Sequence, residues 1–170
     1  VWVRKEPPFD MAYIYMTYLL ELANSKTLIL NDPQALRNIN EKLAILEFPA
    51  WIPPTLVTGK TQNIFQFKNK LGKNLILKPL DERGGRGITR LHSKQKTSAQ
   101  VCIIEKLTRN GKLPILAQEF ISKPDLIADK RIFLLEGKFL AAYERRFAQG
   151  DFRGNLSQGA THHPTTLTPA

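Results

Sequence analysis

The residues most able to do chemistry lie at positions 75–88, where the sequence reads LILKPLDERGGRGI. Lys78 ends an apolar run typical of a buried strand, and Gly84, Gly85 and Gly87 follow in a short loop. Lysine supplies a compact positive charge, and glycines let backbone N–H groups approach an anion without a Cβ in the way. The pattern indicates a phosphate-binding loop. The alternative is an ordinary turn between two strands, with the arginines facing water.

The loop differs from the two common nucleotide-binding motifs. Lys78 precedes the glycines and no Gly-Lys-Ser/Thr follows them, so the loop is not a P-loop. Residues 88–91 alternate like a second strand, which excludes the glycine turn that opens a helix in dinucleotide-binding folds. A glycine loop between antiparallel strands can close as a flap over a nucleoside triphosphate and exclude water from a reactive intermediate.

Composition limits the class of protein. The net charge of +10 favours an anionic partner, which can be nucleic acid, an acidic membrane surface or a small anionic substrate. The basic residues form no run and are not interleaved with aromatic residues, so nothing in their pattern favours nucleic acid. No apolar run is long enough to span a bilayer, and no signal peptide opens the chain. The single Cys102, expected to be buried on an apolar helix face, fits a reducing cytoplasmic setting.

Alternating helices and strands are expected along the chain. Asp10 and Asp32 are good N-caps, and the helix after Asp10 is apolar on almost every side, which predicts that it is buried. Residues 55–109 predict a compact βαββα unit, which the strand at 113–121 leaves, and residues 161–170 read as a loop. The expected helices are 11–24, 33–40, 40–46, 61–70 and 98–109, and the expected strands are 1–3 (the end of a strand), 27–30, 55–58, 74–78, 88–91, 113–121, 130–135 and 138–147.

Seven short motifs in order resemble the ATP-grasp fold, and more closely the bacterial glutathione synthetases. A pair of prolines before Phe9 and Asp10, and the set Arg153, Gly154 and Asn155, point to this family among ATP-grasp enzymes. The motifs are RKEPPFD (4–10), NDPQALR (31–37), NEKL (40–43), ILKPLD (76–81), AQEFI (117–121), DKR (129–131) and FRGNL (152–156).

The resemblance implies an α/β (α+β) chain with an incomplete ATP-grasp fold. Residues 1–41 would be the end of a preceding α/β substrate domain, 42–117 the small ATP-grasp lobe with its glycine flap, and 118–170 an incomplete large lobe. The family uses ATP to phosphorylate the carboxylate of γ-glutamylcysteine, and the amine of glycine then attacks the acyl phosphate. ATP and Mg²⁺ are the implied cofactors, and a homotetramer is the implied assembly of the full-length protein.

The resemblance also implies roles for particular residues. Arg131 and Arg146 would project from a predicted hairpin, which turns at 136–137, toward the phosphoryl group and the substrate carboxylate, with Asp129 orienting Arg131. Arg153 is a catalytic candidate that would hold a carboxylate, and Asn155 would hydrogen-bond the acceptor. Lys42 and Lys78 would bind the ATP phosphates, Gly84, Gly85 and Gly87 would close over them, and backbone groups of Glu119, Phe120 and Ile121 would bind adenine.

The sequence departs from the family pattern at several points. Glu82 and Arg83 follow the loop aspartate where glycine is usual, and Arg145 replaces a small residue. His162 and His163 are adjacent and cannot share one strand face, so no metal ligand is assigned within the chain. The metal ligands of the family, a glutamate and an asparagine, are expected beyond Ala170. We therefore expect a fragment that is inactive alone, because phosphoryl transfer needs the metal.

Two alternatives remain open. The first is another ATP-grasp carboxylate–amine ligase, one that adds glutamate or alanine. The second is a non-catalytic basic module that binds nucleotide or nucleic acid, whose affinity would fall steeply with salt. The glutathione synthetase interpretation predicts small-molecule substrates, with neither nucleic acid nor membrane as partner.

Overall fold

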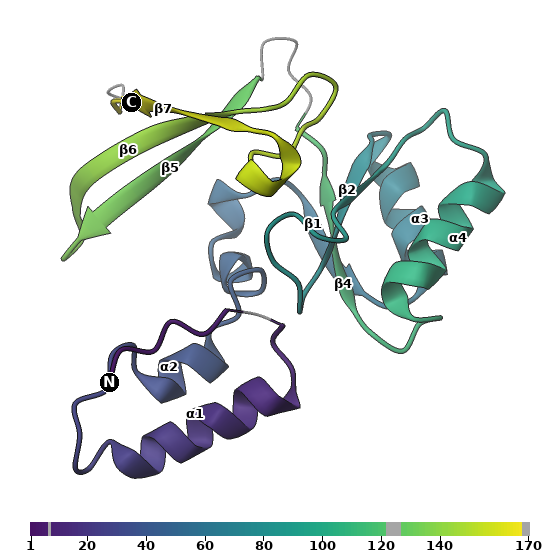
Figure 1. The fold of residues 1–170 in the computed structure, drawn as a ribbon. Coiled ribbons are helices and arrows are strands. Elements are labelled where there is room, and N and C mark those ends of the chain that lie inside the picture. Colours follow the sequence, from purple (N-terminus) through teal and green to yellow (C-terminus); the bar gives the residue numbers. More distant parts are fainter. Residues whose placement is uncertain (7, 122–126, 168–170) are drawn as a thin grey trace. The chain divides into compact units, whose positions relative to one another are not determined.

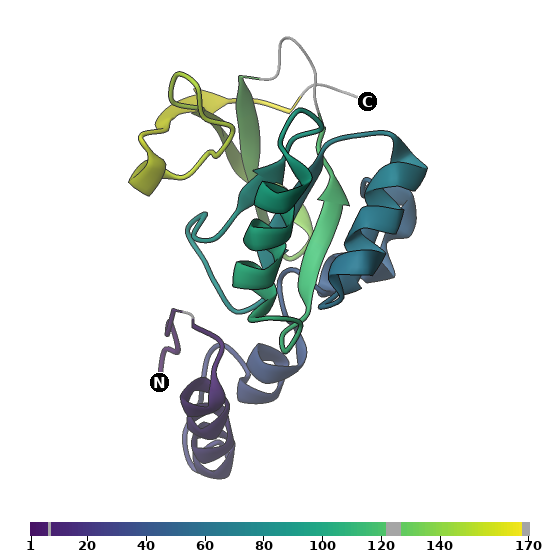
Figure 2. The same ribbon diagram turned by 90° about the vertical axis from the view of Figure 1, so that its right-hand side faces the viewer.

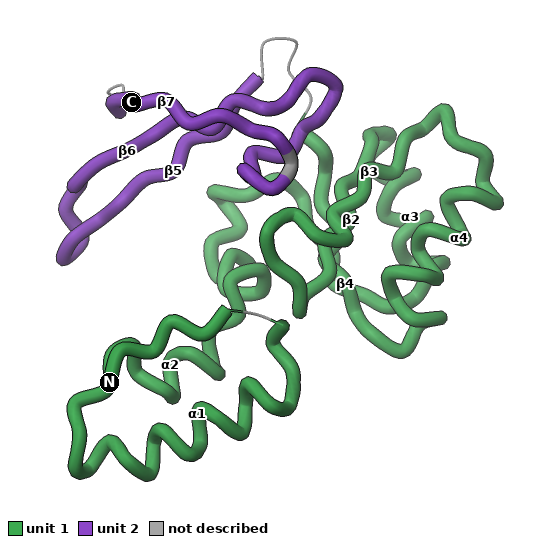
Figure 3. The backbone as a smooth tube through the Cα atoms, in the orientation of Figure 1, with its two compact units in different colours: residues 1–121 green, residues 122–170 purple. Residues whose placement is uncertain are grey.

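The computed structural model describes residues 1–6, 8–121 and 127–167 (Figure 1). The chain divides into two compact units, residues 1–121 and residues 122–170, which are coloured separately in Figure 3. The first unit confirms the expected mixture of helices and sheet, whereas the described part of the second is a sheet with one 3₁₀ helix.

Two capped helices open the first unit. α1 (Met11–Ala23) begins after Asp10, whose Oδ1 accepts a hydrogen bond from the Tyr13 N–H at 2.9 Å. α2 (Pro33–Asn38) begins in the same way, because the Asp32 Oδ1 accepts from the Ala35 N–H at 2.7 Å. Both predicted N-caps are confirmed. The short helix expected at 40–46 is a turn followed by the 3₁₀ helices η1 (Ala44–Glu47) and η2 (Pro49–Trp51).

α1 is not buried, so that prediction is wrong. Only Tyr13 and Thr17 are buried on this helix. The described chain offers α2 as its packing partner, through Arg37, which pairs with Glu21 and lies 4.6 Å from the centroid of the Tyr18 ring. α2 is short and covers only one side of α1, whereas apolar residues lie on almost every side of α1. The apolar residues left exposed are Met11, Tyr15, Tyr18, Leu19 and Leu22.

A four-stranded antiparallel sheet forms the centre of the first unit, with strand order β1-β4-β2-β3. Figure 2 gives a second view of the chain, turned by 90°. The strand expected to leave the βαββα unit instead lies inside it, because its backbone pairs with β1 on one side and β2 on the other. The elements are β1 (Thr55–Thr58), α3 (Thr61–Leu71), β2 (Leu75–Pro79), β3 (Thr89–Leu91), α4 (Thr97–Thr108) and β4 (Ile115–Glu119).

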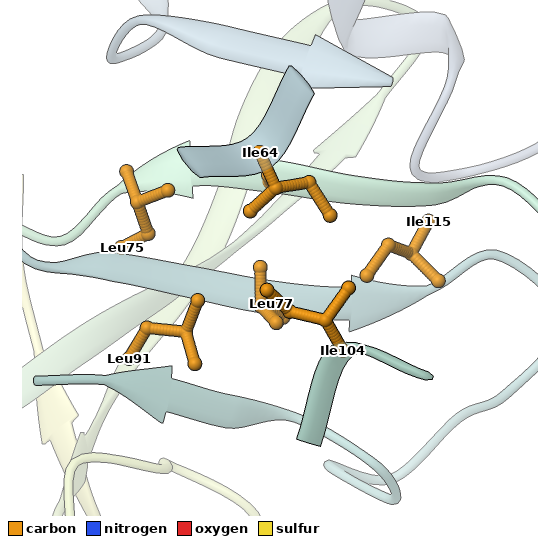
Figure 4. Packing of buried hydrophobic residues seen from close by; sticks show 7 residues of the cluster. Ile64, Leu75, Leu77, Leu91, Ile104 and Ile115 are labelled. Carbon is orange, nitrogen blue, oxygen red and sulfur yellow. The ribbon is translucent and has the colours of Figure 1, made fainter. Parts of the chain in front are cut away.

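The core lies between one face of this sheet and the helices α3 and α4 (Figure 4). Leu75 and Leu77 point into it from β2, and Ile64 and Ile104 meet them from the two helices, all with no exposed surface. Cys102 was expected to be buried here but is exposed. The buried positions of α4 are Gln100, Ile104 and Thr108, and a four-residue repeat leaves residue 102 on the opposite side of the helix.

The second unit is a three-stranded antiparallel sheet of order β5-β6-β7. β5 (Ala128–Leu135) and β6 (Lys138–Arg146) form the predicted hairpin with its turn at 136–137. Residues 161–165 were expected to be a loop, but they form β7 (Thr161–Thr165) because they pair with the free edge of β6. Before β7 comes η3 (Leu156–Gln158). The apolar residues exposed on the hairpin are Ile132, Phe133, Leu134, Leu135, Phe139 and Leu140.

No helix in the described part of the chain is long and apolar enough to cross a membrane.

Replacing Leu77 by alanine tests the core. The side chain is fully buried between β2 and the two helices, so Leu77→Ala should lower the free energy of unfolding by about 2–5 kcal/mol. Urea denaturation followed by far-UV circular dichroism measures this change. The control is Cys102→Ala, which removes an exposed side chain and should change the free energy by less than about 0.5 kcal/mol. A large loss in the control would mean that Cys102 is buried after all.

Candidate functional site

A row of polar side chains crosses the face of the first sheet that turns away from α3 and α4. Because Leu75 and Leu77 point into the core, Lys78 belongs to the other face. Its Nζ donates to the Gln118 Oε1 at 2.8 Å, and the Gln118 Nε2 donates to the Thr55 Oγ1 at 2.8 Å. Gln118 and Thr55 were missed in the sequence. They stand directly opposite each other in the β1–β4 register, which local patterns do not reveal.

Lys42 lies close enough to Lys78 for the two charges to interact. Burial lowers the pKa of Lys78, and the positive charge of Lys42 lowers it further. Lys42 is itself mostly buried and donates to the Glu82 backbone oxygen and, at 3.1 Å, to the Glu41 Oε1. The structure therefore brings the two predicted phosphate ligands together at the end of β2. Two neighbouring cations are a favourable place for a polyanion.

The three predicted glycines form the tight part of the loop after β2. Gly84, Gly85 and Gly87 have φ angles of 62°, 81° and 66°. These values lie in the left-handed region, which residues with a Cβ rarely adopt. A Cβ on Gly87 would lie 2.7 Å from the Pro79 Cγ, so the loop packs directly on the end of the strand. Arg83 bonds the Glu6 carboxylate at 3.0 Å, which ties the loop to the segment before α1. All three positions need glycine for conformational reasons.

A pocket of about 360 Å³ opens beside Lys42. Phe9 and Tyr13 line it from the start of the chain, Ile39 from the end of α2, and Glu82 from the glycine loop. Burial, followed by the charge of Glu6, raises the pKa of Tyr13. Local sequence patterns do not predict this pocket, because its walls come from three separate segments of the chain.

The end of β4 carries the three residues predicted to bind adenine. The Glu119 N–H donates to the Pro54 oxygen and the Phe120 N–H donates to the Asn74 oxygen, both at 2.9 Å. The N–H groups of Glu119 and Phe120 are thus bonded within the protein, and adenine binding by backbone groups of residues 119–121 stays a prediction. The Arg90 Cζ lies 4.0 Å from the centroid of the Phe120 ring, a cation–π contact that the sequence reading did not anticipate.

The predicted arginines of the second unit do not share one face of the hairpin. In the register, Arg131 stands opposite Tyr143, whereas Arg146 stands opposite Ala128. Side chains alternate along both strands, so Arg131 and Arg146 lie on opposite faces of the sheet. The Arg146 Nε donates to the Glu144 Oε1 at 2.8 Å, and this hydrogen bond is the main cause of the lowered pKa of Glu144.

Asp129 binds Arg145, so the prediction that it orients Arg131 is wrong. The Arg145 Nε and Nη2 donate to the two carboxylate oxygens of Asp129 at 2.6 and 2.7 Å, a two-pronged pair that raises the pKa of Arg145. The two residues stand directly opposite each other in the register. A small residue at position 145 would leave Asp129 without this partner. Gly154 packs on the pair, since a Cβ there would lie 2.7 Å from the Asp129 Oδ2.

Arg153 also holds a carboxylate of its own chain. Its Nε donates to the Asp151 Oδ1 at 3.0 Å and its Nη2 to the Oδ2 at 2.7 Å. The Asp151 Oδ1 accepts, in addition, from the backbone N–H groups of Phe152 and Arg153. The bond from Arg153 is the largest cause that lowers the pKa of Asp151 to about 2. Asn155, the other predicted acceptor ligand, precedes η3 and is half-buried.

The described residues contain no group of three or more His, Cys, Asp or Glu side chains that could hold a metal ion. His162 and His163 lie on β7, where the His162 ring stacks 4.6 Å from Tyr143 and the His163 Nε2 is 3.0 Å from the Thr161 Oγ1. No magnesium ligand is therefore assigned among the described residues.

The fold and the candidate site together place the chain among ATP-grasp proteins. The features are an antiparallel sheet with two helices on one face, a lysine at a strand end and a glycine loop beside it. Family models extend this: the prokaryotic glutathione synthetase ATP-grasp domain matches residues 41–170, and the N-terminal domain of the same enzymes matches residues 1–37. The chain belongs to the prokaryotic glutathione synthetase family.

Curated relatives agree. Glutathione synthetase of Nitrosomonas europaea is 47% identical over 165 residues, which are 95% of this chain and 50% of that protein. Glutathione synthetase of Parasynechococcus marenigrum is 41% identical over 170 residues, 99% of this chain and 54% of that protein. The chain thus spans about half the length of these relatives.

Solved structures support the fold alone. D-alanyl-alanine synthetase A from Vibrio cholerae has a TM-score of 0.62 at 18% identity, covering 95% of this chain and 52% of that one. The ATP-grasp ligase PsnB, in a complex with Mg and ADP, has a TM-score of 0.57 at 23% identity and covers 91% of this chain and 46% of that one.

The interaction between the two lysines can be measured directly. Lys42→Met removes the neighbouring charge, so the pKa of Lys78 should rise toward its ordinary value of 10.5 but stay below it, because burial remains. A pH titration of the Lys78 side-chain NMR resonances gives this value. Lys106→Met, an exposed position on α4, is the matched control and should leave the Lys78 pKa unchanged. An unchanged pKa in Lys42→Met would show that the two ammonium groups are far apart.

Proposed function

We propose that this chain provides the ATP-binding lobe and part of the acceptor site of an enzyme that makes glutathione. The reaction joins γ-glutamylcysteine to glycine: ATP phosphorylates the γ-glutamylcysteine carboxylate, and the glycine amine displaces phosphate from the acyl phosphate. The observation that carries the proposal is the placement of two half-buried lysines at the glycine loop of a member of the glutathione synthetase family: Lys42 donates to the Glu82 backbone oxygen in that loop, and Lys78 lies near the end of β2, which precedes it.

The two lysines would bind the phosphates of ATP. The charges of Lys42 and Lys78 repel each other, Lys42 is paired among the described carboxylates only with the exposed Glu41, and a polyphosphate would offset the repulsion. The nucleotide would also favour the charged form of Lys78, whose pKa is lowered by burial and by Lys42. Gln118 accepts a hydrogen bond from Lys78 and would keep its ammonium group at the end of β2. Compact point charges suit this role, since they contact phosphate oxygens without requiring one geometry.

The glycine loop would cover the phosphates. The positive φ angles of Gly84, Gly85 and Gly87 turn backbone N–H groups along a tight curve, and such a curve forms an anion-binding concavity. The loop would also exclude water, which otherwise hydrolyses the acyl phosphate. At the end of β4, the Ile121 N–H would donate to adenine, because the N–H groups of Glu119 and Phe120 are engaged elsewhere.

Arginines of the second unit would handle the carboxylates. Arg153 would hold the carboxylate of the acceptor, with Asn155 hydrogen-bonding beside it. Arg131 and Arg146 would each stabilise charge that develops on the transferring phosphoryl group or on the substrate carboxylate, from their separate faces of the hairpin. Mg²⁺ would neutralise charge between the β and γ phosphates when it is bound. The described residues supply no ligand set for it.

We place this activity in the cytoplasm. Cys102 is a free and exposed thiol, and such thiols stay reduced in that compartment. ATP is abundant there as well.

Nucleotide binding by the chain tests the lysine pair. Lys78→Met should weaken ADP binding about tenfold or more in calorimetry, because it removes a charge-assisted hydrogen bond to phosphate. Lys106→Met removes one positive charge from the exposed side of α4 and should bind as the unchanged chain does. Equal weakening in both variants would point to a general effect of net charge, and would contradict a specific phosphate site.

The acceptor is tested by ADP release. A protein that joins this chain to the segments of a related glutathione synthetase that it does not span should release ADP only when γ-glutamylcysteine and glycine are both present. The chain alone should bind nucleotide without turnover. Release that depends on alanine or glutamate would indicate another ATP-grasp ligase. Salt-sensitive binding of nucleic acid that ATP does not displace would indicate a binding module instead.

A further inference from the structure

The guanidinium predicted to receive the acceptor carboxylate already holds one. Asp151 presents both oxygens to Arg153, with the Nε at 3.0 Å from Oδ1 and the Nη2 at 2.7 Å from Oδ2. This is the two-pronged geometry by which arginine binds a free carboxylate. The loop before η3 therefore shows the ligand chemistry of Arg153, with a residue of the chain as the ligand.

We propose that Asp151 is an internal competitor for the carboxylate that Arg153 binds, so that an incoming acceptor carboxylate must displace it. Asp151 thereby sets the affinity of the site for carboxylates. The inference deepens the proposed function and rests on it for the identity of the acceptor.

The two oxygens of Asp151 have different partners, so the pair with Arg153 can open while the turn stays bonded. Oδ1 accepts from the Phe152 N–H at 2.7 Å and the Arg153 N–H at 3.0 Å, so it caps the turn of the loop. In the described structure Oδ2 accepts only from the Arg153 side chain, at 3.2 Å from Nε and 2.7 Å from Nη2. Release of Arg153 therefore need not unfold the turn.

Electrostatics gives the direction of the effect. The ion pair between Asp151 and Arg153 is neutral as a whole, so it attracts a second carboxylate weakly, and the two carboxylates would repel each other across one guanidinium. The side chains retain 28% exposure at Arg153 and 19% at Asp151, so water reaches the pair and screens it. Ion pairs in such places contribute little net stability, which keeps displacement within reach of a small ligand.

The test uses Asp151→Asn in the full 170-residue chain. Asparagine keeps the Oδ1 acceptor for the two backbone N–H groups and for the Arg153 Nε, but it removes the negative charge and replaces Oδ2 by an NH₂ group, which cannot accept from the Arg153 Nη2. The control is Glu136→Gln, which changes the net charge by the same amount at the hairpin turn, at the opposite end of β5 and β6 from Asp129 and Arg145. Dispersion of the backbone amide NMR spectrum checks that both variants stay folded.

The measurement is a titration with acetate at constant ionic strength, observed at the Nε–H resonance of Arg153. Loss of that resonance in Arg153→Lys assigns it. Asp151→Asn should lower the acetate Kd about three- to tenfold relative to the unchanged chain, and Glu136→Gln should leave it unchanged. An equal Kd in Asp151→Asn, a higher one, or no binding in either protein would overturn the proposal. A higher Kd would make Asp151 an orienting group for Arg153.

Titration with glycine and with γ-glutamylcysteine separates this inference from the proposed function. If Asp151→Asn binds acetate more tightly while neither substrate binds better than acetate, the internal competitor stands and the assignment of Arg153 to the glutathione acceptor fails. If glycine or γ-glutamylcysteine binds more tightly than acetate and gains from Asp151→Asn, both hold.

Discussion

The alternation of side chains along β2 decides where the candidate site lies. Leu75 and Leu77 are fully buried against α3 and α4. Because side chains alternate along the strand, Lys78 lies on the opposite face of the sheet. Lys78 then meets Gln118, which the pairing of β4 with both β1 and β2 brings into the middle of the sheet. A shift of one residue in this register would bury the lysine among leucines. The strand register therefore determines both the hydrophobic core on one face of the sheet and the row of polar side chains on the other.

The same alternation governs the second unit, but there it separates residues. It sets Arg131 and Arg146 on opposite faces of the hairpin and sets Arg145 directly across from Asp129. Two arginines of this unit bind carboxylates of their own chain: Arg146 donates to Glu144, and Arg153 donates to Asp151. The pairs hold the guanidinium groups in fixed directions, and they also leave the positive charge of these groups partly neutralised.

The sequence predicted most of the elements, because caps, turns and apolar periods are local signals. The helix starts after Asp10 and Asp32, the glycine loop and the hairpin turn all follow such signals. Wrong predictions concern partners distant in sequence: the central place of β4, the exposure of α1 and the pairing of Asp129. Gln118 and Asp151 were missed as site residues since their neighbours are set by strand register and loop closure.

The uncovered apolar residues of α1 and of the hairpin have a consequence for handling the chain in solution. Leu19, Leu22 and Phe133 face water on a molecule of net charge +10, so mutual repulsion is what keeps such surfaces of two molecules apart. That repulsion reaches ~30 Å at 0.01 M salt but only ~8 Å at 0.15 M. The repulsion between molecules of this chain should therefore be strongest in dilute buffer, and added salt should promote association through these apolar residues.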